Sequence, residues 1–264
     1  MDTSTLFSLA GRVALVTGGS RGIGRMIAAG FIAQGAKVYI SARKADACEK
    51  TAAELSRGGG TCVALPVDAS TVEGAQALAK AFLARESRLD ILVNNAGAAW
   101  LEKFDRFPEK GWDKVVDLNL KTPFFLTQAL AGALRAAASE ARPAKVINIA
   151  SIDGVSVNPQ ETYSYAASKA GLIHLTRRMA LRLIEDRIVV TAIAPGAFSS
   201  DMNVDARDRG DEVAKRIPAR RIGRDEDMAG AAIYLASRAG DYVVGTTLVV
   251  DGGVSDARGG GGAA

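Results

Sequence analysis

The sequence predicts a single-domain α/β fold, a doubly wound parallel sheet of seven strands with helices on both faces. Short apolar runs alternate with helical patterns along the whole chain, so successive strands are joined by helical crossovers. The runs are apolar at nearly every position, which is typical of strands covered on both faces. The first run ends in a cluster of glycines from which a helix begins.

The predicted elements follow one another in strict alternation. Runs rich in Val, Ile and Leu predict strands at residues 12–17, 37–41, 62–66, 90–94, 145–150, 188–193 and 247–250. Helical patterns predict crossovers at residues 22–34, 45–56, 70–86, 109–120, 122–138, 164–183 and 225–236. Gly35 ends the first helix, glycines 58–60 end the second, and Ser70 can cap the third.

Length and composition indicate one globular domain. A chain of 264 residues suits one α/β domain, expected at residues 8–253, with flexible tails at 1–7 and 254–264. The net charge of +4 is small and the charges are interspersed, which argues against a nucleic-acid-binding protein. Two cysteines are too few for a disulfide framework, and no His/Cys cluster predicts a metal site. We expect no secretory signal and no membrane span, and therefore a cytoplasmic protein.

The glycine-rich turn is the first candidate binding site. It reads Thr17-Gly-Gly-Ser-Arg-Gly-Ile-Gly24 and joins the first strand to the first helix. Glycines let the backbone turn sharply and approach a pyrophosphate, and the helix N-terminus offers free N–H groups. We therefore expect a dinucleotide to contact Gly18, Ser20, Arg21, Gly22, Ile23 and Gly24. A tight turn without a ligand is the alternative.

The end of the second strand indicates which dinucleotide is bound. A dinucleotide fold that selects NAD places a carboxylate near this point, to bind the ribose hydroxyls. Ala42 and Arg43 are found there instead, and Arg21 can reach the same side. Two guanidinium groups suit the 2′-phosphate of NADPH. A solvated arginine at a strand end is the alternative for Arg43.

Further motifs lie near the ends of later strands. They are Asn94-Asn-Ala-Gly97, Asn119, Ser151, Tyr165-Ala-Ala-Ser-Lys169 and Pro195-Gly196. Together with the glycine turn, they resemble the short-chain dehydrogenase/reductase family over about residues 8–253. Within that family, residues 7–24, 41–43, 111–112 and 146–149 are most similar to the 3-oxoacyl-acyl-carrier-protein reductase type, including its rhamnolipid-linked form.

The resemblance implies a catalytic group of four residues. Tyr165 would be the general acid, and Lys169 would bind the nicotinamide ribose and lower the pKa of Tyr165. Ser151 would hydrogen-bond the carbonyl oxygen, and Asn119 would support a water chain to Lys169. Tyr165 and Lys169 are four residues apart on a helix and share a face, where an ammonium favours the phenolate. A surface tyrosine–lysine pair and a Ser151 that only caps a turn are the alternatives.

The resemblance also extends the cofactor site beyond the glycine turn and Arg43. It implies contacts from Asp68, Ala69, Asn95, Ala96, Gly97, Tyr165, Lys169, Pro195, Gly196, Phe198 and Ser200. Asn94 is expected to line the path of the adenosine ribose, while Asp68 can instead cap the next helix. Residues 198–217, a long irregular stretch, are expected to form a lid over the substrate.

Three nearby polar residues are expected to take no part in the chemistry. Tyr163 has no lysine one helical turn later. Ser168 is expected to point away from the site. His174, the only histidine, is interpreted as structural.

Together with the resemblance, these residues predict an NADPH-dependent reduction of a ketone to a secondary alcohol, with a 3-oxoacyl thioester or a related carbonyl compound as the expected substrate. An alcohol or sugar-alcohol dehydrogenase acting oxidatively is the enzymatic alternative, and a non-catalytic dinucleotide-binding regulator is the alternative of another class. An acyl carrier protein is a candidate partner, because Arg135, Arg142 and Arg187 could form a basic rim near the site; solvated charges are the alternative. The resemblance also implies a homotetramer, because members of the family commonly pair these long helices, and burial of the faces at 127–138 and 164–183 would permit that packing.

Overall fold

A computed structural model describes residue 3 and residues 5–257, so residues 1–2 and 4 of the first predicted tail and residues 258–264 of the second lie outside the described part. Seven parallel strands form one sheet in the order β3-β2-β1-β4-β5-β6-β7. They are β1 (Val13–Thr17), β2 (Lys37–Ser41), β3 (Thr61–Leu65), β4 (Ile91–Asn94), β5 (Ala144–Ile149), β6 (Ile188–Pro195) and β7 (Thr247–Val250). Each strand boundary lies within two residues of its predicted place, and the predicted fold class is confirmed.

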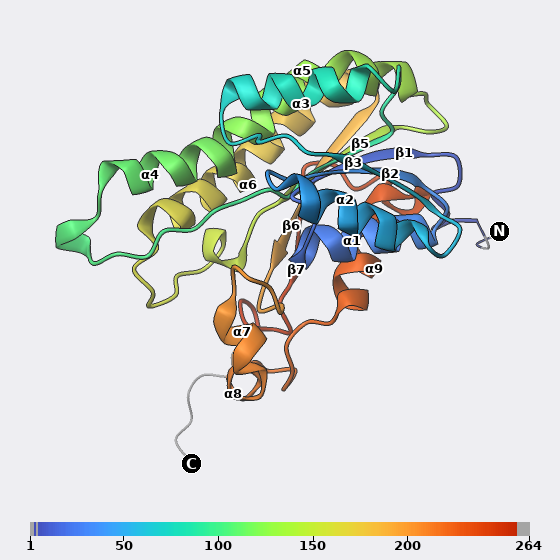
Figure 1. Ribbon diagram of the computed structural model, residues 1–264. Helices are drawn as coiled ribbons and strands as arrows, with labels where there is room; N and C mark the ends of the chain where they lie inside the picture. Colours follow the sequence, from blue (N-terminus) through green and yellow to red (C-terminus); the bar gives the residue numbers. More distant parts are fainter. Residues whose placement is uncertain (1–2, 4, 258–264) are drawn as a thin grey trace.

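Helices cover both faces of the sheet (Figure 1). One face carries α1 (Gly22–Ala33), α2 (Ala45–Ser56) and α9 (Asp225–Ala236). The other carries α3 (Val72–Leu83), α5 (Thr122–Ala137) and α6 (Tyr163–Leu183), with α4 (Glu109–Val116) beside α6. Two short helices, α7 (Val204–Asp208) and α8 (Gly210–Ala214), form a lobe beyond the end of β6. None of the helices in the described part of the chain is long and apolar enough to cross a membrane.

Each face of the sheet has its own core, which explains the continuous apolar runs. Val16 and Val93 pack towards α1 and α9. Their sequence neighbours Leu15 and Leu92 pack towards α3 and α5. Because successive side chains of a strand point to opposite faces, a strand buried on both sides must be apolar at every position.

Residues 109–137 form one continuous helix, where the sequence predicts two. A wide π-type turn over Asp117–Lys121 joins α4 to α5. The wide turn lies just before Pro123, which has no N–H to continue the α-helical hydrogen-bond pattern. It contains Asn119, whose side chain is buried.

The start of α3 also differs from the prediction. The helix begins at Val72, and Thr71 caps it by accepting a hydrogen bond from the Gly74 N–H at 3.1 Å. The expected cap, Ser70, lies one residue too early, because an N-cap oxygen reaches the N–H two or three residues on.

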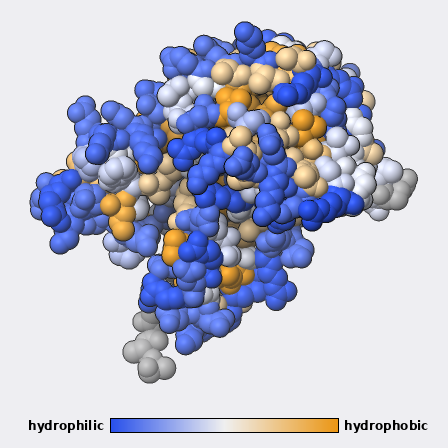
Figure 2. Space-filling view, in the orientation of Figure 1, coloured by the Kyte–Doolittle hydropathy of each residue, from blue (hydrophilic) through white to orange (hydrophobic). Residues whose placement is uncertain are grey.

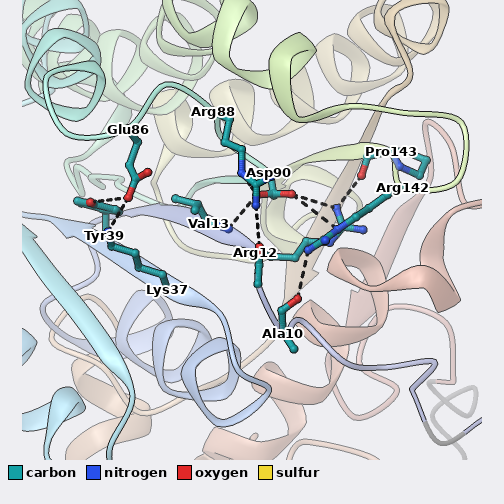
Figure 3. Close-up of polar contacts among 11 residues, drawn as sticks. Ala10, Arg12, Val13, Lys37, Tyr39, Glu86, Arg88, Asp90, Arg142 and Pro143 are labelled. Atoms are coloured by element: carbon teal, nitrogen blue, oxygen red, sulfur yellow. Dashed lines mark hydrogen bonds and ion pairs between the residues drawn. The ribbon is translucent and has the colours of Figure 1, made fainter.

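The amino edge of the sheet is held together around Asp90 (Figure 3). The Asp90 carboxylate accepts a hydrogen bond from the Val13 N–H at 2.9 Å. The Arg12 guanidinium donates to the Pro143 carbonyl at 2.8 Å, and Arg142 Nε lies 3.8 Å from Asp90 Oδ1. These contacts join the starts of β1, β4 and β5.

The predicted basic rim is wrong for the same topological reason. Arg142 and Arg187 precede β5 and β6, and Arg135 near the end of α5 pairs with Asp186, Nε to Oδ2 at 3.0 Å. Residues that precede parallel strands lie at the amino edge, whereas ligands bind at the carboxyl edge. The three arginines therefore lie on the side away from the candidate site.

Candidate active site

The glycine-rich turn forms a backbone cradle at the carboxyl end of β1. Gly18 and Gly22 have φ angles of +65° and +52°, in the left-handed region that favours glycine. A Cβ atom at Gly24 would lie 2.4 Å from the Gly18 carbonyl oxygen, so α1 packs directly against the turn. No side chain caps the N-terminus of α1, which leaves that end suited to an anion. The same turn contains the predicted residues Ser20, Arg21 and Ile23.

Thr17 ties this cradle to the end of β4. Its Oγ1 accepts hydrogen bonds from the N–H groups of Asn95 and Ala96, both at 2.9 Å. Asn95 Nδ2 in turn donates to the Thr17 carbonyl at 2.8 Å. The sequence prediction misses the role of Thr17; a hydroxyl at the last position of a buried strand is the signal that could have found it.

The predicted residues after β2 and β3 lie at the same edge. Arg43 is exposed and makes no ion pair within the described part of the chain. Asp68 Oδ1 accepts a hydrogen bond from the Ser70 N–H at 3.0 Å, and the Ala69 carbonyl accepts one from Thr122 Oγ1 at 2.7 Å. Asp68 therefore stabilises the turn before α3 and does not cap the helix.

Tyr165, Lys169 and Ser151 lie together where β5 leads into the start of α6. Lys169 Nζ donates to the Ile149 carbonyl at 2.7 Å and lies 5.5 Å from the centre of the Tyr165 ring. Lys169 is only 4% exposed. Ser151 Oγ accepts a hydrogen bond from the Asp153 N–H at 3.1 Å, and the Ser151 side chain also interacts with the Tyr165 hydroxyl.

Asn119 is fixed beside this group. Its Nδ2 donates to the Ala98 carbonyl at 2.9 Å and to Ser168 Oγ at 3.0 Å, and its Oδ1 accepts from the Ala98 N–H at 2.8 Å. A Cβ atom at Gly97 would lie 3.2 Å from Asn119 Oδ1 and 3.7 Å from Lys169 Nζ. Asn119, Gly97 and Lys169 therefore meet at one point.

Ser168 takes part in the site, contrary to the prediction that it points away. Its buried hydroxyl donates to the Tyr165 carbonyl at 2.8 Å and accepts from Asn119 Nδ2. Residues three apart on a helix share a face, so Ser168 follows Tyr165 inward. It connects the helix that carries Tyr165 to Asn119.

Burial governs the pKa values of the two central groups. Burial raises the pKa of the Tyr165 hydroxyl to about 12; the Ser151 side chain opposes this rise, and the Asp153 charge adds to it. Burial lowers the pKa of Lys169 to about 8. The expected lowering of the Tyr165 pKa by Lys169 is not found, because the Lys169 ammonium donates to the Ile149 carbonyl and lies over the ring. At pH 7 Tyr165 is therefore a protonated phenol and Lys169 is mainly an ammonium.

Asn94 does not line a cofactor path as expected. Its Nδ2 donates to Asn148 Oδ1 at 2.8 Å, and the side chain is buried inside the fold. Because neighbouring side chains of a strand point in opposite directions, Asn95 faces the glycine turn and Asn94 faces away from it.

The segment after β6 runs beside the glycine turn. Pro195 ends β6, and the Gly196 N–H donates to the Val250 carbonyl at 2.9 Å. Phe198 is 2% exposed, and its ring packs in the hydrophobic core. A Cβ atom at Gly22 would lie 3.1 Å from Ser200 Cβ, so the segment touches the cradle at that point.

Two hollows flank α6. A cavity of about 400 Å³ is lined by Gly154, Val155, Ala170, Ile173, His174, Arg177, Thr247 and Val249. A groove of about 550 Å³ lies at the N-terminal end of the helix and is lined by Phe104, Phe107, Pro108, Glu109, Trp112 and Tyr163. The Tyr163 hydroxyl donates to Glu161 at 3.2 Å.

Known proteins resemble this chain over almost its whole length. Residues 18–255 match the family model described as enoyl-(acyl carrier protein) reductase. A rhamnolipids biosynthesis 3-oxoacyl-[acyl-carrier-protein] reductase of Pseudomonas aeruginosa is 47% identical, covering 94% of this chain and 97% of that protein. A 2-dehydro-3-deoxy-D-gluconate 5-dehydrogenase of Dickeya dadantii is 37% identical, covering 94% and 96%.

Solved structures agree with these matches. The solved structure of the Pseudomonas aeruginosa RhlG/NADP active-site complex has a TM-score of 0.91 and 46% identity, covering 95% of this chain and 98% of that one. A putative gluconate 5-dehydrogenase of Beutenbergia cavernae with bound NADP has a TM-score of 0.86 and 36% identity, covering 94% and 98%. The chain therefore belongs to the short-chain dehydrogenase/reductase family and is an oxidoreductase.

Proposed function

We propose that this protein uses NADPH to reduce the ketone of a 3-oxoacyl thioester, or of a related carbonyl compound, to a secondary alcohol. One observation carries the proposal. A half-buried tyrosine that stays protonated at neutral pH lies with Ser151 and Lys169, and Lys169 Nζ lies close to Gly97, which follows the strand end tied to the glycine cradle.

The carboxyl edge fits a dinucleotide phosphate. The cradle at Gly18 and Gly24 has no room for side chains, so a pyrophosphate can approach its backbone. Arg21 and Arg43 supply positive charge at the same edge, where a 2′-phosphate would bind. NADP in the similar solved structures supports this choice.

The four polar side chains provide the remaining chemistry. NADPH, when bound, supplies the hydride to the carbonyl carbon. Tyr165 gives its hydroxyl proton to the carbonyl oxygen, and the Ser151 hydroxyl donates a hydrogen bond to the same oxygen. Lys169 is the ammonium from which the phenolate regains a proton, and Asn119 holds the polar path beside it.

The protonation state of Tyr165 favours reduction. Reduction needs a phenol that can donate, and a pKa of about 12 keeps the phenol protonated at neutral pH. Oxidation starts from the phenolate, which is scarce at neutral pH and more abundant at high pH. We propose reduction at neutral pH from this protonation state, together with the NADP-bound relatives.

Two features favour an uncharged, chain-like substrate over a sugar acid. The aromatic groove lies at the end of α6 that carries Tyr165, and it suits an alkyl chain. The Asp153 carboxylate is close enough to raise the pKa of Tyr165, so it would repel the carboxylate of a sugar acid bound there.

Following NADPH oxidation against a panel of carbonyl compounds tests the proposal. Short and long 3-oxoacyl thioesters should be reduced, with kcat/KM rising with chain length, and NADPH should be preferred over NADH. Turnover of 5-keto-gluconate and not of the thioesters would refute the proposed substrate. Equal kcat/KM with both cofactors would refute the proposed role of the two arginines.

A further inference from the structure

The ion pair of Asp201 connects the glycine cradle to the segment after β6. Arg21 Nη1 lies 2.5 Å from Asp201 Oδ2, and Arg207 Nη1 lies 2.9 Å from Asp201 Oδ1. Both arginines lower the pKa of the Asp201 carboxyl, so it is ionised at neutral pH. One carboxylate therefore holds a residue of the cradle and a residue of α7 at the same time.

The contact around Asp201 is supported by the backbone on both sides. Ser200 lies against Gly22, with 3.1 Å between the Ser200 Cβ and a Cβ built at Gly22. Phe198 and Ile217 are 2% and 4% exposed and anchor the two ends of the segment in the core. Between these anchors most side chains are exposed, and Figure 2 shows the lobe of α7 and α8 as mainly hydrophilic on this face.

Arg21 therefore has two possible partners of the same charge. In this structure its guanidinium binds the Asp201 carboxylate. The proposed function assigns it to the 2′-phosphate of NADPH, together with Arg43, which has no ion-pair partner in the described residues. Arg21 Nη1 is occupied by the Asp201 carboxylate in this structure, so a 2′-phosphate that binds this nitrogen has to displace that carboxylate.

We propose that Asp201 is a specificity-determining residue for the cofactor, which competes with the 2′-phosphate for Arg21. The inference rests on the proposed use of NADPH. Binding of the 2′-phosphate draws Arg21 away from Asp201 and frees the segment of residues 199–216 from the cradle. NADH has no 2′-phosphate and leaves the Arg21–Asp201 pair in place.

The pair is suited to exchange partners because it is solvated. The Arg21 and Asp201 side chains are 69% and 48% exposed. Solvated ion pairs are weak. Removing the competing Asp201 carboxylate should therefore change the dissociation constant of a ligand with a 2′-phosphate by about two- to fivefold. A doubly charged phosphate offers Arg21 a stronger partner than a single carboxylate.

Binding of cofactor fragments to Asp201→Asn tests the inference without catalysis. The probes are adenosine 2′,5′-bisphosphate and 5′-AMP, measured by calorimetry. Asp201→Asn should bind the bisphosphate about two- to fivefold more tightly than wild type and 5′-AMP equally well. Asp205→Asn is the matched control, because Asp205 pairs with Arg209 in the same segment and should leave both affinities unchanged.

Trypsin cleavage gives a second readout, because residues 199–216 contain several arginines and a lysine. Adenosine 2′,5′-bisphosphate should speed cleavage there in wild type, and Asp201→Asn should be cleaved faster before any ligand is added. Unchanged bisphosphate affinity in Asp201→Asn, or an equal gain for 5′-AMP, overturns the inference.

Arg21→Ala separates this inference from the proposed function. If Asp201 acts only through Arg21, then adding Asp201→Asn to Arg21→Ala changes nothing further. Wild-type protein that does not discriminate the two fragments contradicts the proposed cofactor itself. Wild-type discrimination with no effect of Asp201→Asn contradicts only the role of Asp201.

Discussion

Replacing Lys169 by Met should make the folded protein more stable at neutral pH while it removes activity. Lys169 is buried, and burial lowers its pKa from 10.5 to about 8. That difference corresponds to about 3 kcal/mol of free energy against the folded, charged form. Met keeps a similar length without a charge. The gain in free energy of unfolding from Lys169→Met is reduced by about 1–2 kcal/mol, because the Ile149 carbonyl loses its hydrogen-bond donor.

The dependence on pH isolates the charge from the lost hydrogen bond. Below pH 8 the folded and unfolded wild-type chains both carry the Lys169 proton, so the folded protein bears the full cost of burying the ammonium. Between pH 8 and 10.5 only the unfolded chain keeps it, so wild-type stability gains about 1.4 kcal/mol for each pH unit. The advantage of Lys169→Met should therefore shrink by about 2 kcal/mol between pH 7 and 9.5.

Urea unfolding of both proteins at pH 7 and 9.5 measures this difference. Lys110→Met, which removes an exposed lysine of α4, controls for the loss of a positive charge. A stability difference between wild type and Lys169→Met that stays constant over this pH range would refute a buried, destabilised ammonium.

Three further outcomes follow from the same contacts. Ser168→Ala removes one hydrogen bond of Asn119 and should lower the free energy of unfolding by about 1–2 kcal/mol. It should also lower kcat and leave the NADP+ affinity unchanged. An unchanged kcat would argue against a positioning role for Ser168. Gly24→Ala places a Cβ 2.4 Å from the Gly18 carbonyl, so calorimetry should detect NADP+ binding weakened at least tenfold, and a normal affinity would contradict the cradle. Burial raises the pKa of the Cys62 thiol to about 12, so a thiol reagent should modify it far more slowly than free cysteine at pH 8.

The fold could be predicted from the sequence because each strand is buried on both faces. Apolar runs such as those of β1 and β4, once they alternate with helical patterns, predict strands of a parallel sheet that is covered on both faces. Local details were less accessible. Ser70 and Thr71 can both cap a helix and serine is the more common cap, so residue type alone favours Ser70, whereas the backbone places Thr71 at the cap position.

The site could be predicted where a motif fixes both residue type and place. Tyr165 and Lys169 meet as their spacing requires. The effect of Lys169 on the Tyr165 pKa could not be predicted, because it depends on where the ammonium points and on how deeply both groups are buried. The roles of Ser168 and Asp201 depend on contacts with residues far away in the sequence, 49 positions for the first and 180 for the second.

The Tyr165→Phe variant tests the central claim most directly, through turnover and NADP+ affinity measured on the same preparation. The removed hydroxyl is the proposed proton donor, while the ring that packs under Lys169 remains. We predict NADP+ affinity within about twofold of wild type and a kcat for ketone reduction at least about a hundredfold lower. A kcat within tenfold of wild type would contradict Tyr165 as the general acid.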